Sequence, residues 1–90
     1  MPQIRVEFFG VPRERAACAS IEVAVSKLIL SEVLAETARQ LPEFGRRCLI
    51  DGRLQTGLVA NINGRQFTTD TTTQLTDGDS VLILSADVGG

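Results

Sequence analysis

The order in which the hydrophobic pattern changes along the chain constrains the fold most. Residues 3–9 and 20–25 each alternate apolar and polar side chains, which is typical of strands with one buried face. The apolar residues that follow recur every three or four positions, which predicts an amphipathic helix. A single helical stripe among several strand patterns predicts a sheet with one face covered by this helix and the other face partly open.

The predicted helix ends at a proline. Its buried stripe is expected to consist of Leu30, Val33, Leu34, Thr37, Ala38 and Leu41. Ser31 is the expected N-cap, because its hydroxyl can accept a hydrogen bond from an unpaired N–H of the first turn. Pro42 ends the helix, since proline disfavours helical geometry at the residue before it. From Glu43 to Gly57 we predict an irregular connection, with a short extended piece at Cys48–Ile50.

Further strands are predicted in the second half of the chain. The strand Leu58–Ile62 and a short return strand flank Asn63-Gly64, a pair that tolerates the positive φ of a tight hairpin turn. Val81–Leu84 is an unbroken apolar run, which favours a central strand with neighbours on both sides. If the first two strands pair antiparallel and the helix crosses the sheet, this last strand lies parallel beside the first. The prediction is an α+β fold of the ubiquitin-like β-grasp type, with four to five strands in a mixed sheet and one main helix on one face.

The last residues of the sequence are its most unusual feature. Gly89 and Gly90 follow the last strand closely, although glycine adds no packing and loses much conformational entropy on folding. A peptide without Cβ atoms can enter a narrow slot. We therefore predict that the carboxylate of Gly90 is the functional group and that Gly89 gives access to it. The bland alternative is an unused terminus. We expect one domain over residues 1–90, with a flexible tail at 86–90.

Composition limits the classes of partner. The 90 residues include nine Lys and Arg and eleven Asp and Glu, and the net charge of -2 does not favour nucleic acid or an anionic membrane. There is no signal peptide or membrane span in the pattern, so we expect the cytoplasm. Cys18 and Cys48 are too far apart for a CxxC pair and are expected to be reduced. Asp77 and Asp79 are assigned to a turn, and no metal site is predicted.

Several segments together resemble the MoaD/ThiS family of ubiquitin-like sulfur carriers. They are the opening strand I-R-V-E-F-F, the helix S-E-V-L-A-E-T-A-R-Q-L-P, the hairpin N-I-N-G-R and the ending L-T-D-G-D-S-V-L-I-L-S-A-D-V-G-G. The ending is the most specific of these, because it combines a turn, an apolar strand and Gly-Gly in a set order. In length the chain is most similar to the small subunit of molybdopterin synthase.

The resemblance implies a protein that carries sulfur and does not itself catalyse. A ubiquitin-activating-type adenylating enzyme would use ATP to convert the carboxylate of Gly90 into an acyl-adenylate. Sulfur from a persulfide donor would then displace AMP and leave a thiocarboxylate on Gly90. A sulfur-accepting synthase subunit, with which the chain would form a synthase complex, would take this sulfur for molybdopterin or, as alternatives, for thiamine or cysteine. No cofactor is expected on the chain itself.

The last strand also predicts a docking surface. Alternation separates Val81 and Ile83 from Leu82 and Leu84, and the resemblance to ubiquitin implies that the first pair faces the helix. The other pair then lies on the open face and is available to a partner. The predicted partner-binding residues are Phe9, Val59, Leu82, Leu84 and Val88. The alternative is that a loop or a second copy of the chain covers them.

Other functions are consistent with the same residues. One is a ubiquitin-like binding module or protein modifier without sulfur transfer, whose activated carboxylate would form an isopeptide with lysine. Another is an enzyme with Cys18 or Cys48 as nucleophile, which is disfavoured because the chain has no histidine to act as the base. The fate of the activated carboxylate separates the carrier from the modifier.

Overall fold

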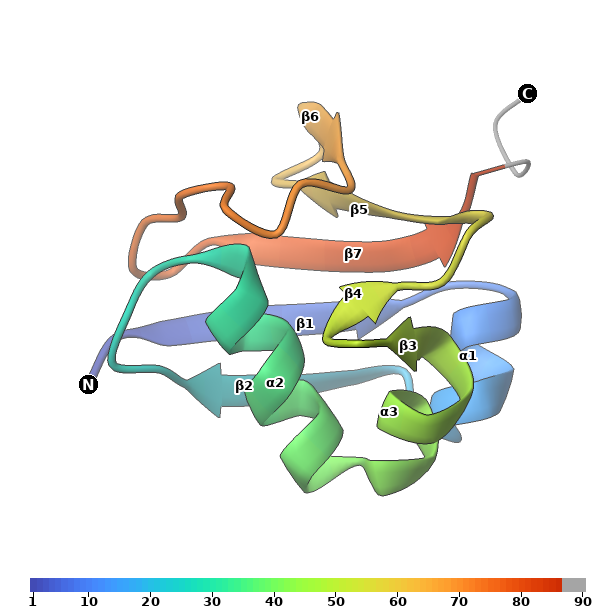
Figure 1. The fold of residues 1–90 in the computed structure, drawn as a ribbon. Coiled ribbons are helices and arrows are strands. Elements are labelled where there is room, and N and C mark those ends of the chain that lie inside the picture. Colours follow the sequence, from blue (N-terminus) through green and yellow to red (C-terminus); the bar gives the residue numbers. More distant parts are fainter. Residues whose placement is uncertain (87–90) are drawn as a thin grey trace.

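A mixed sheet forms the centre of the computed structural model, which describes residues 1–86 (Figure 1). Within these residues the sheet has five strands in the order β2-β1-β7-β5-β6, and β3 and β4 form a separate two-stranded sheet. The strands are β1 (Gln3–Phe8), β2 (Ser20–Ala24), β3 (Leu49–Ile50), β4 (Arg53–Leu54), β5 (Leu58–Ile62), β6 (Gln66–Thr68) and β7 (Ser80–Ser85). The helices are α1 (Val11–Ala16), α2 (Leu30–Gln40) and α3 (Pro42–Cys48).

The last strand of the chain lies in the middle of the sheet. β7 pairs in parallel with β1, where Phe8 lies opposite Ile83, and antiparallel with β5, where Ala60 lies opposite Ile83. β1 in turn pairs antiparallel with β2. The α+β prediction, with a mixed sheet and the last strand parallel to the first, is therefore confirmed. A strand with neighbours on both sides hydrogen-bonds along both edges, which agrees with its continuous apolar sequence.

The helices pack on one face of this sheet, and the core lies between them (Figure 1). Val81 and Ile83 of β7 are fully buried there. The rings of Phe8 from β1 and Phe44 from α3 lie 5.3 Å apart between their centroids. The predicted stripe of α2 faces the same core through Leu30, Val33, Leu34 and Thr37. Within residues 1–86, no helix combines the length and the hydrophobicity that a membrane span requires.

The prediction of an irregular connection from Glu43 to Gly57 is wrong over much of that segment. It contains most of α3 and the hairpin of β3 and β4, which turns at Asp51 and Gly52 with φ values of 52° and 76°. Leu41 is at once the C-cap of α2 and the N-cap of α3, so Pro42 ends one helix and begins the next. A helix of only two turns gives too short a hydrophobic period to be recognised in the sequence.

The prediction that Ser31 is the N-cap of α2 is also wrong. The helix begins two residues earlier than this cap implies, at Leu30, with Ile29 as N-cap and no hydrogen bond from a capping side chain. Backbone carbonyls of the loop after β6 replace the cap: the N–H of Leu30 donates to Thr73 (2.9 Å) and that of Ser31 donates to Thr71 (2.9 Å). These acceptors lie about 40 residues further along the chain, where a local capping rule does not reach.

Gly45 of α3 lies close against Ala38 of α2 and provides a test of the packing of these helices. A Cβ atom on Gly45 would lie 2.7 Å from the Cβ of Ala38. We expect Gly45→Ala to lower the free energy of unfolding by about 1–2 kcal/mol, because overpacking outweighs the better helix propensity of alanine. Urea unfolding followed by circular dichroism measures this. In an Ala38→Gly background the same substitution should lose its destabilising effect. Equal losses in both backgrounds would contradict the packing argument.

Candidate functional site

The chain leaves the sheet at a defined point at the end of β7. Ser85 pairs with Leu58, and the N–H of Ala86 donates to the carbonyl of Gly57 at 2.7 Å. The central strand therefore carries the chain to one end of the sheet, and pairing holds it there as far as Ala86 (Figure 1). Residues 87–90 lie outside the described residues. The predicted roles of Val88, Gly89 and Gly90 therefore stay predictions.

The residues predicted to bind a partner on β5 and β7 lie on the face of the sheet opposite the helices. Val81 and Ile83 are fully buried in the core, so alternation directs Leu82 and Leu84 to the open face, where both are partly exposed. Val59 pairs directly with Leu84 across the antiparallel β5–β7 ladder and shares this face. The structure thus brings these three side chains together on an accessible surface, and their binding role stays a prediction.

Phenylalanines extend this surface on both sides. Phe9 follows the buried Phe8, and its N–H donates to the carbonyl of Ile83 at 3.0 Å, so its side chain lies on the open face with 49% exposure. Phe67 of β6 is 66% exposed and pairs with Asn61, which places it on the same face. Phe67 is not among the partner-binding residues predicted from the sequence. The alternation of Phe67 with Thr68, which faces inward, could have indicated that Phe67 lies on the open face. A strand of three residues is too short, however, for alternation to be recognised in the sequence.

A hollow lies within this apolar surface. Its volume is about 390 Å³, and it is lined by Glu7, Asn61, Asn63, Gly64, Ser80 and Leu82. Asn63 is held in place, because its amide accepts a hydrogen bond from the N–H of Ser80 (2.8 Å) and donates to Asp79 (2.9 Å). Asn61 is only 6% exposed, and its Oδ1 has no hydrogen-bond partner among residues 1–86. We call this site the Asn61 hollow.

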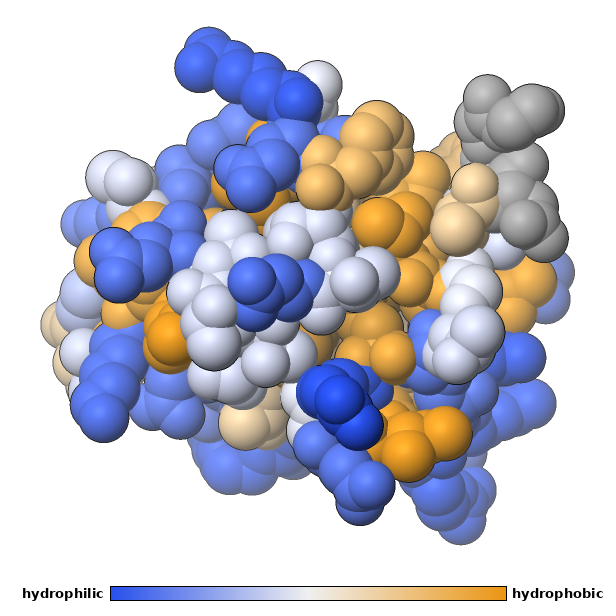
Figure 2. Space-filling view, turned by 45° about the horizontal axis from the view of Figure 1, so that its top comes forward, coloured by the Kyte–Doolittle hydropathy of each residue, from blue (hydrophilic) through white to orange (hydrophobic). Residues whose placement is uncertain are grey.

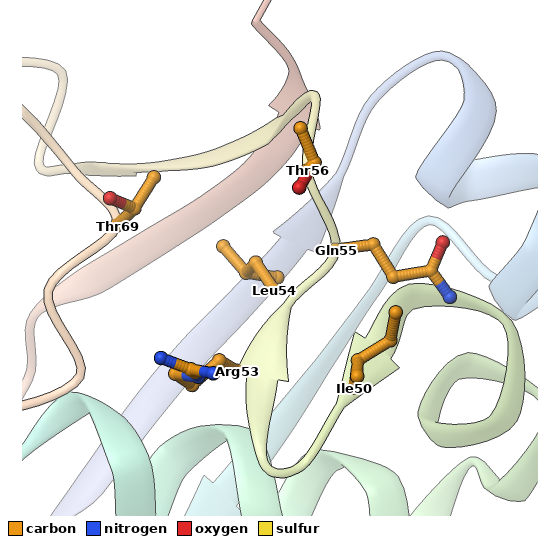
Figure 3. Close-up of a pocket in the computed structure, with 6 residues that line it drawn as sticks. All are labelled: Ile50, Arg53, Leu54, Gln55, Thr56 and Thr69. Carbon is orange, nitrogen blue, oxygen red and sulfur yellow. The ribbon is translucent and has the colours of Figure 1, made fainter.

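A second hollow lies on the helix side, between the β3–β4 hairpin and the loop after β6 (Figure 3). It encloses about 330 Å³ and is lined by Ile50, Arg53, Leu54, Gln55, Thr56 and Thr69. Figure 3 shows the side chains of Arg53 and Leu54 on the side facing Thr69, with Ile50 and Gln55 on the other side. Hydrophobic and hydrophilic side chains are intermixed over the face of the molecule that Figure 2 shows. Residues 1–86 hold no cluster of His, Cys, Asp or Glu suited to a metal ion here or elsewhere.

The two cysteines differ in their surroundings, and Cys48 is not suited to act as a nucleophile. Cys48 is fully buried, and burial raises the pKa of its thiol more than the nearby Arg15 lowers it. Cys18 is partly buried, and its thiol donates to the carbonyl of Ser20 with the sulfur 3.2 Å away. Both are free thiols. A raised pKa keeps the buried sulfur protonated, whereas attack on a substrate requires the thiolate.

This arrangement predicts different reactivity of the two thiols. We expect iodoacetamide at pH 8 to alkylate Cys18 roughly tenfold or more faster than Cys48, because the buried thiol reacts only when the structure opens. Mass spectrometry of quenched, digested samples gives both rates. In urea, where the chain is unfolded, the rates should become similar. Faster reaction of Cys48 in the native state would reopen the enzyme interpretation.

Sequence comparison and structure comparison give different results. No protein-family model matches this chain, and no curated protein sequence matches it. Solved structures, in contrast, are similar to it, and three examples show how far the similarity extends. SAMP1 from Haloferax volcanii has a TM-score of 0.82 at 19% identity, over 98% of this chain and 99% of that chain. A putative molybdopterin converting factor, subunit 1, from Pyrococcus furiosus has a TM-score of 0.74 at 16% identity, over 94% of this chain and 98% of that chain. A chain of the BexX/CysO complex from Amycolatopsis orientalis has a TM-score of 0.71 at 17% identity, over 97% of this chain and 99% of that chain.

These likenesses extend over nearly the whole length of each chain, and at such low identity they show the fold. The architecture is that of ubiquitin-like β-grasp proteins, with the central last strand and the helix-covered face described above. The predicted resemblance in fold is thereby confirmed, and it includes a putative molybdopterin converting factor subunit.

Proposed function

We propose that this chain, which shares the ubiquitin-like fold of those neighbours, is a sulfur carrier whose reactive group is the carboxylate of Gly90. The observation that carries the proposal is the position of β7. The strand nearest the Gly-Gly sequence is the central strand of the sheet, held by β1 and β5 on either side. A rigid body is thereby attached directly to the segment proposed to enter a partner enzyme.

The chemistry converts a poor electrophile into a good one. The carboxylate attacks ATP bound by a separate adenylating enzyme, which gives an acyl-adenylate and pyrophosphate. The terminal sulfur of a persulfide then attacks the acyl carbon, and AMP leaves with the electrons of the C–O bond. A thiol reductant cleaves the remaining S–S bond, which leaves a thiocarboxylate on Gly90. Glycine at positions 89 and 90 suits this path, since it adds no Cβ atom to a peptide in a narrow channel.

The open face supplies the proposed contact with the adenylating enzyme and the sulfur-accepting synthase subunit. Apolar side chains exposed together on one face of a small protein are typical of a binding surface. The similarity to a chain of the BexX/CysO complex supports a role in complexes with other proteins. The requirement for ATP is consistent with the cytoplasmic location that the sequence predicts.

A more specific proposal concerns the biosynthetic pathway that receives the sulfur. We favour molybdopterin synthesis, which the similarity to a putative molybdopterin converting factor subunit supports. Thiamine and cysteine synthesis are the alternatives within sulfur transfer. A second candidate function is a protein modifier joined to lysine by an isopeptide bond. It is supported by the similarity to another SAMP1, the small archaeal modifier protein 1 of Methanosarcina acetivorans.

The thiocarboxylate is directly measurable. We expect incubation with ATP, an adenylating enzyme of the ubiquitin-activating type, a persulfide donor and a reductant to increase the intact mass by the difference between sulfur and oxygen. Fragmentation should locate the change on Gly90. Deletion of Gly90 should abolish it, and Gly89→Val should slow it strongly because a branched Cβ obstructs the channel. Circular dichroism should show both variants folded, since the substitutions lie beyond β7.

The same reaction separates the alternatives. Pyrophosphate release followed by an isopeptide on lysine, without a thiocarboxylate, would support the modifier. Absence of any product on Gly90 with several active adenylating enzymes would overturn the carrier proposal.

Docking on the open face has its own test. We expect Phe9→Ser and Phe67→Ser each to lower kcat/KM for adenylation about tenfold, mainly through KM, because large exposed aromatic side chains bury much apolar area when a partner docks on them. Both residues are exposed, so the melting temperature should change little. Ile50→Ser is the matched control, since Ile50 is 57% exposed but belongs to β3 on the helix side. An equal effect of all three would exclude the open face as the specific surface.

A further inference from the structure

Asn61 is buried at a position where no group among residues 1–86 forms a hydrogen bond with its Oδ1. Its neighbours on β5, Ala60 and Ile62, face the core, so alternation directs the amide of Asn61 to the open face. The side chain is nevertheless only 6% exposed, and its Oδ1 lacks a hydrogen-bond partner among residues 1–86. A buried polar atom without a partner destabilises a fold, and native structures contain few of them. The stability of the isolated chain does not explain why an asparagine occupies this position.

The Asn61 hollow also carries uncompensated negative charge. Glu7 lines it and forms no ion pair within the described part of the chain. Arg5, two residues earlier on the same face, is engaged instead with Glu22 of β2, with Nε and Oε1 3.5 Å apart. Asp79 adjoins the hollow through its hydrogen bond to Asn63. The lining therefore offers the Glu7 carboxylate as an acceptor and includes Asn61, whose Oδ1 is itself buried, and it has no cationic side chain among its members.

Apolar groups border these acceptors. Leu82 lines the hollow and pairs with both Glu7 and Asn61 across the two ladders of β7. Phe67 pairs with Asn61 from the other side. A polar contact at this position would be shielded from water by the surrounding apolar contacts, which is the arrangement in which interface residues contribute most to affinity.

We propose that the Asn61 hollow receives an arginine side chain of the protein that docks on the open face. The proposal rests on the proposed function, in which that face binds a partner. The guanidinium carries donors in a planar fork and so can reach the Glu7 carboxylate and the Asn61 amide oxygen together. Its apolar stem matches the Leu82 and Phe67 border.

Entry of the arginine needs only a local change. The groups that cover Asn61 belong to the open face itself, because the core lies on the other side of the sheet. Phe67, beside it on the edge strand β6, is 66% exposed, so few contacts hold its ring. Rotation of the Asn61 amide exchanges its oxygen and nitrogen and can turn the acceptor towards the hollow.

The experiment uses the whole chain and a defined probe. We titrate 15N-labelled protein with N-acetyl-arginine methylamide, and in parallel with the neutral isostere N-acetyl-citrulline methylamide. We expect saturable shifts in the Asn61 side-chain amide and in the backbone amides of Glu7 and Leu82 with the arginine probe, at millimolar concentration. The citrulline probe should shift these signals several-fold less, because it lacks the positive charge. Equal shifts with both probes, or shifts confined to other acidic residues, would overturn the proposal.

Variants define which groups bind the probe. Glu7→Gln should remove the preference for arginine over citrulline, whereas Glu14→Gln makes the same change of charge on α1 and should leave the preference intact. Asn61→Leu should remove arginine binding and raise the melting temperature by several degrees, since an apolar side chain of similar size needs no hydrogen bond. Binding of arginine that survives both Glu7→Gln and Asn61→Leu would assign the probe to another site.

These outcomes are independent of the thiocarboxylate test. Arginine binding without a sulfur product on Gly90 would support the proposed arginine site and contradict the proposed function as a sulfur carrier. A sulfur product on Gly90 without a preference for arginine over citrulline would support the proposed function as a sulfur carrier and contradict the proposed arginine site. A titration with N-acetyl-lysine methylamide completes the set. Equal binding of lysine and arginine would mean that the hollow recognises a positive charge and not the planar guanidinium, which would overturn the assignment to arginine.

Discussion

The structure depends on the insertion of β7 between β1 and β5. These two strands come from opposite halves of the chain, and β7 joins them by a parallel ladder on one side and an antiparallel ladder on the other. Val81 and Ile83, which this pairing directs to the helix side, are fully buried among residues from both halves. Without β7 the first hairpin and the second would be separate small sheets, each too small to be stable in water.

The central position of β7 connects stability with the proposed function. Alternation along a single strand assigns Val81 and Ile83 to the core and Leu82 and Leu84 to the open face. The strand that completes the core is also the one that leads to the Gly-Gly sequence. An enzyme that binds the open face would therefore contact the strand whose continuation it is proposed to activate.

Much of the fold follows from local pattern. Alternation identified β1 and β2, an unbroken apolar run identified β7, and the 3.6-residue period identified α2, because each of these segments is long enough to show its pattern. Asn63-Gly64 marked its hairpin through the positive φ values that the structure shows, 55° and 71°. Pattern failed where the segment was short, as in α3, or where a distant loop acts as the cap, as Thr71 and Thr73 do for α2.

The sequence by itself therefore determined the class of fold, the central last strand and the alternation that leaves Leu82 and Leu84 on the open face. These properties depend on periods of two or 3.6 residues, which neighbouring positions in one segment define. Only the tertiary structure decided that Phe67, Asn61, Leu82 and Glu7 lie side by side. They come from four different strands, and their neighbourhood depends on the register between strands, which a pattern within one strand does not contain.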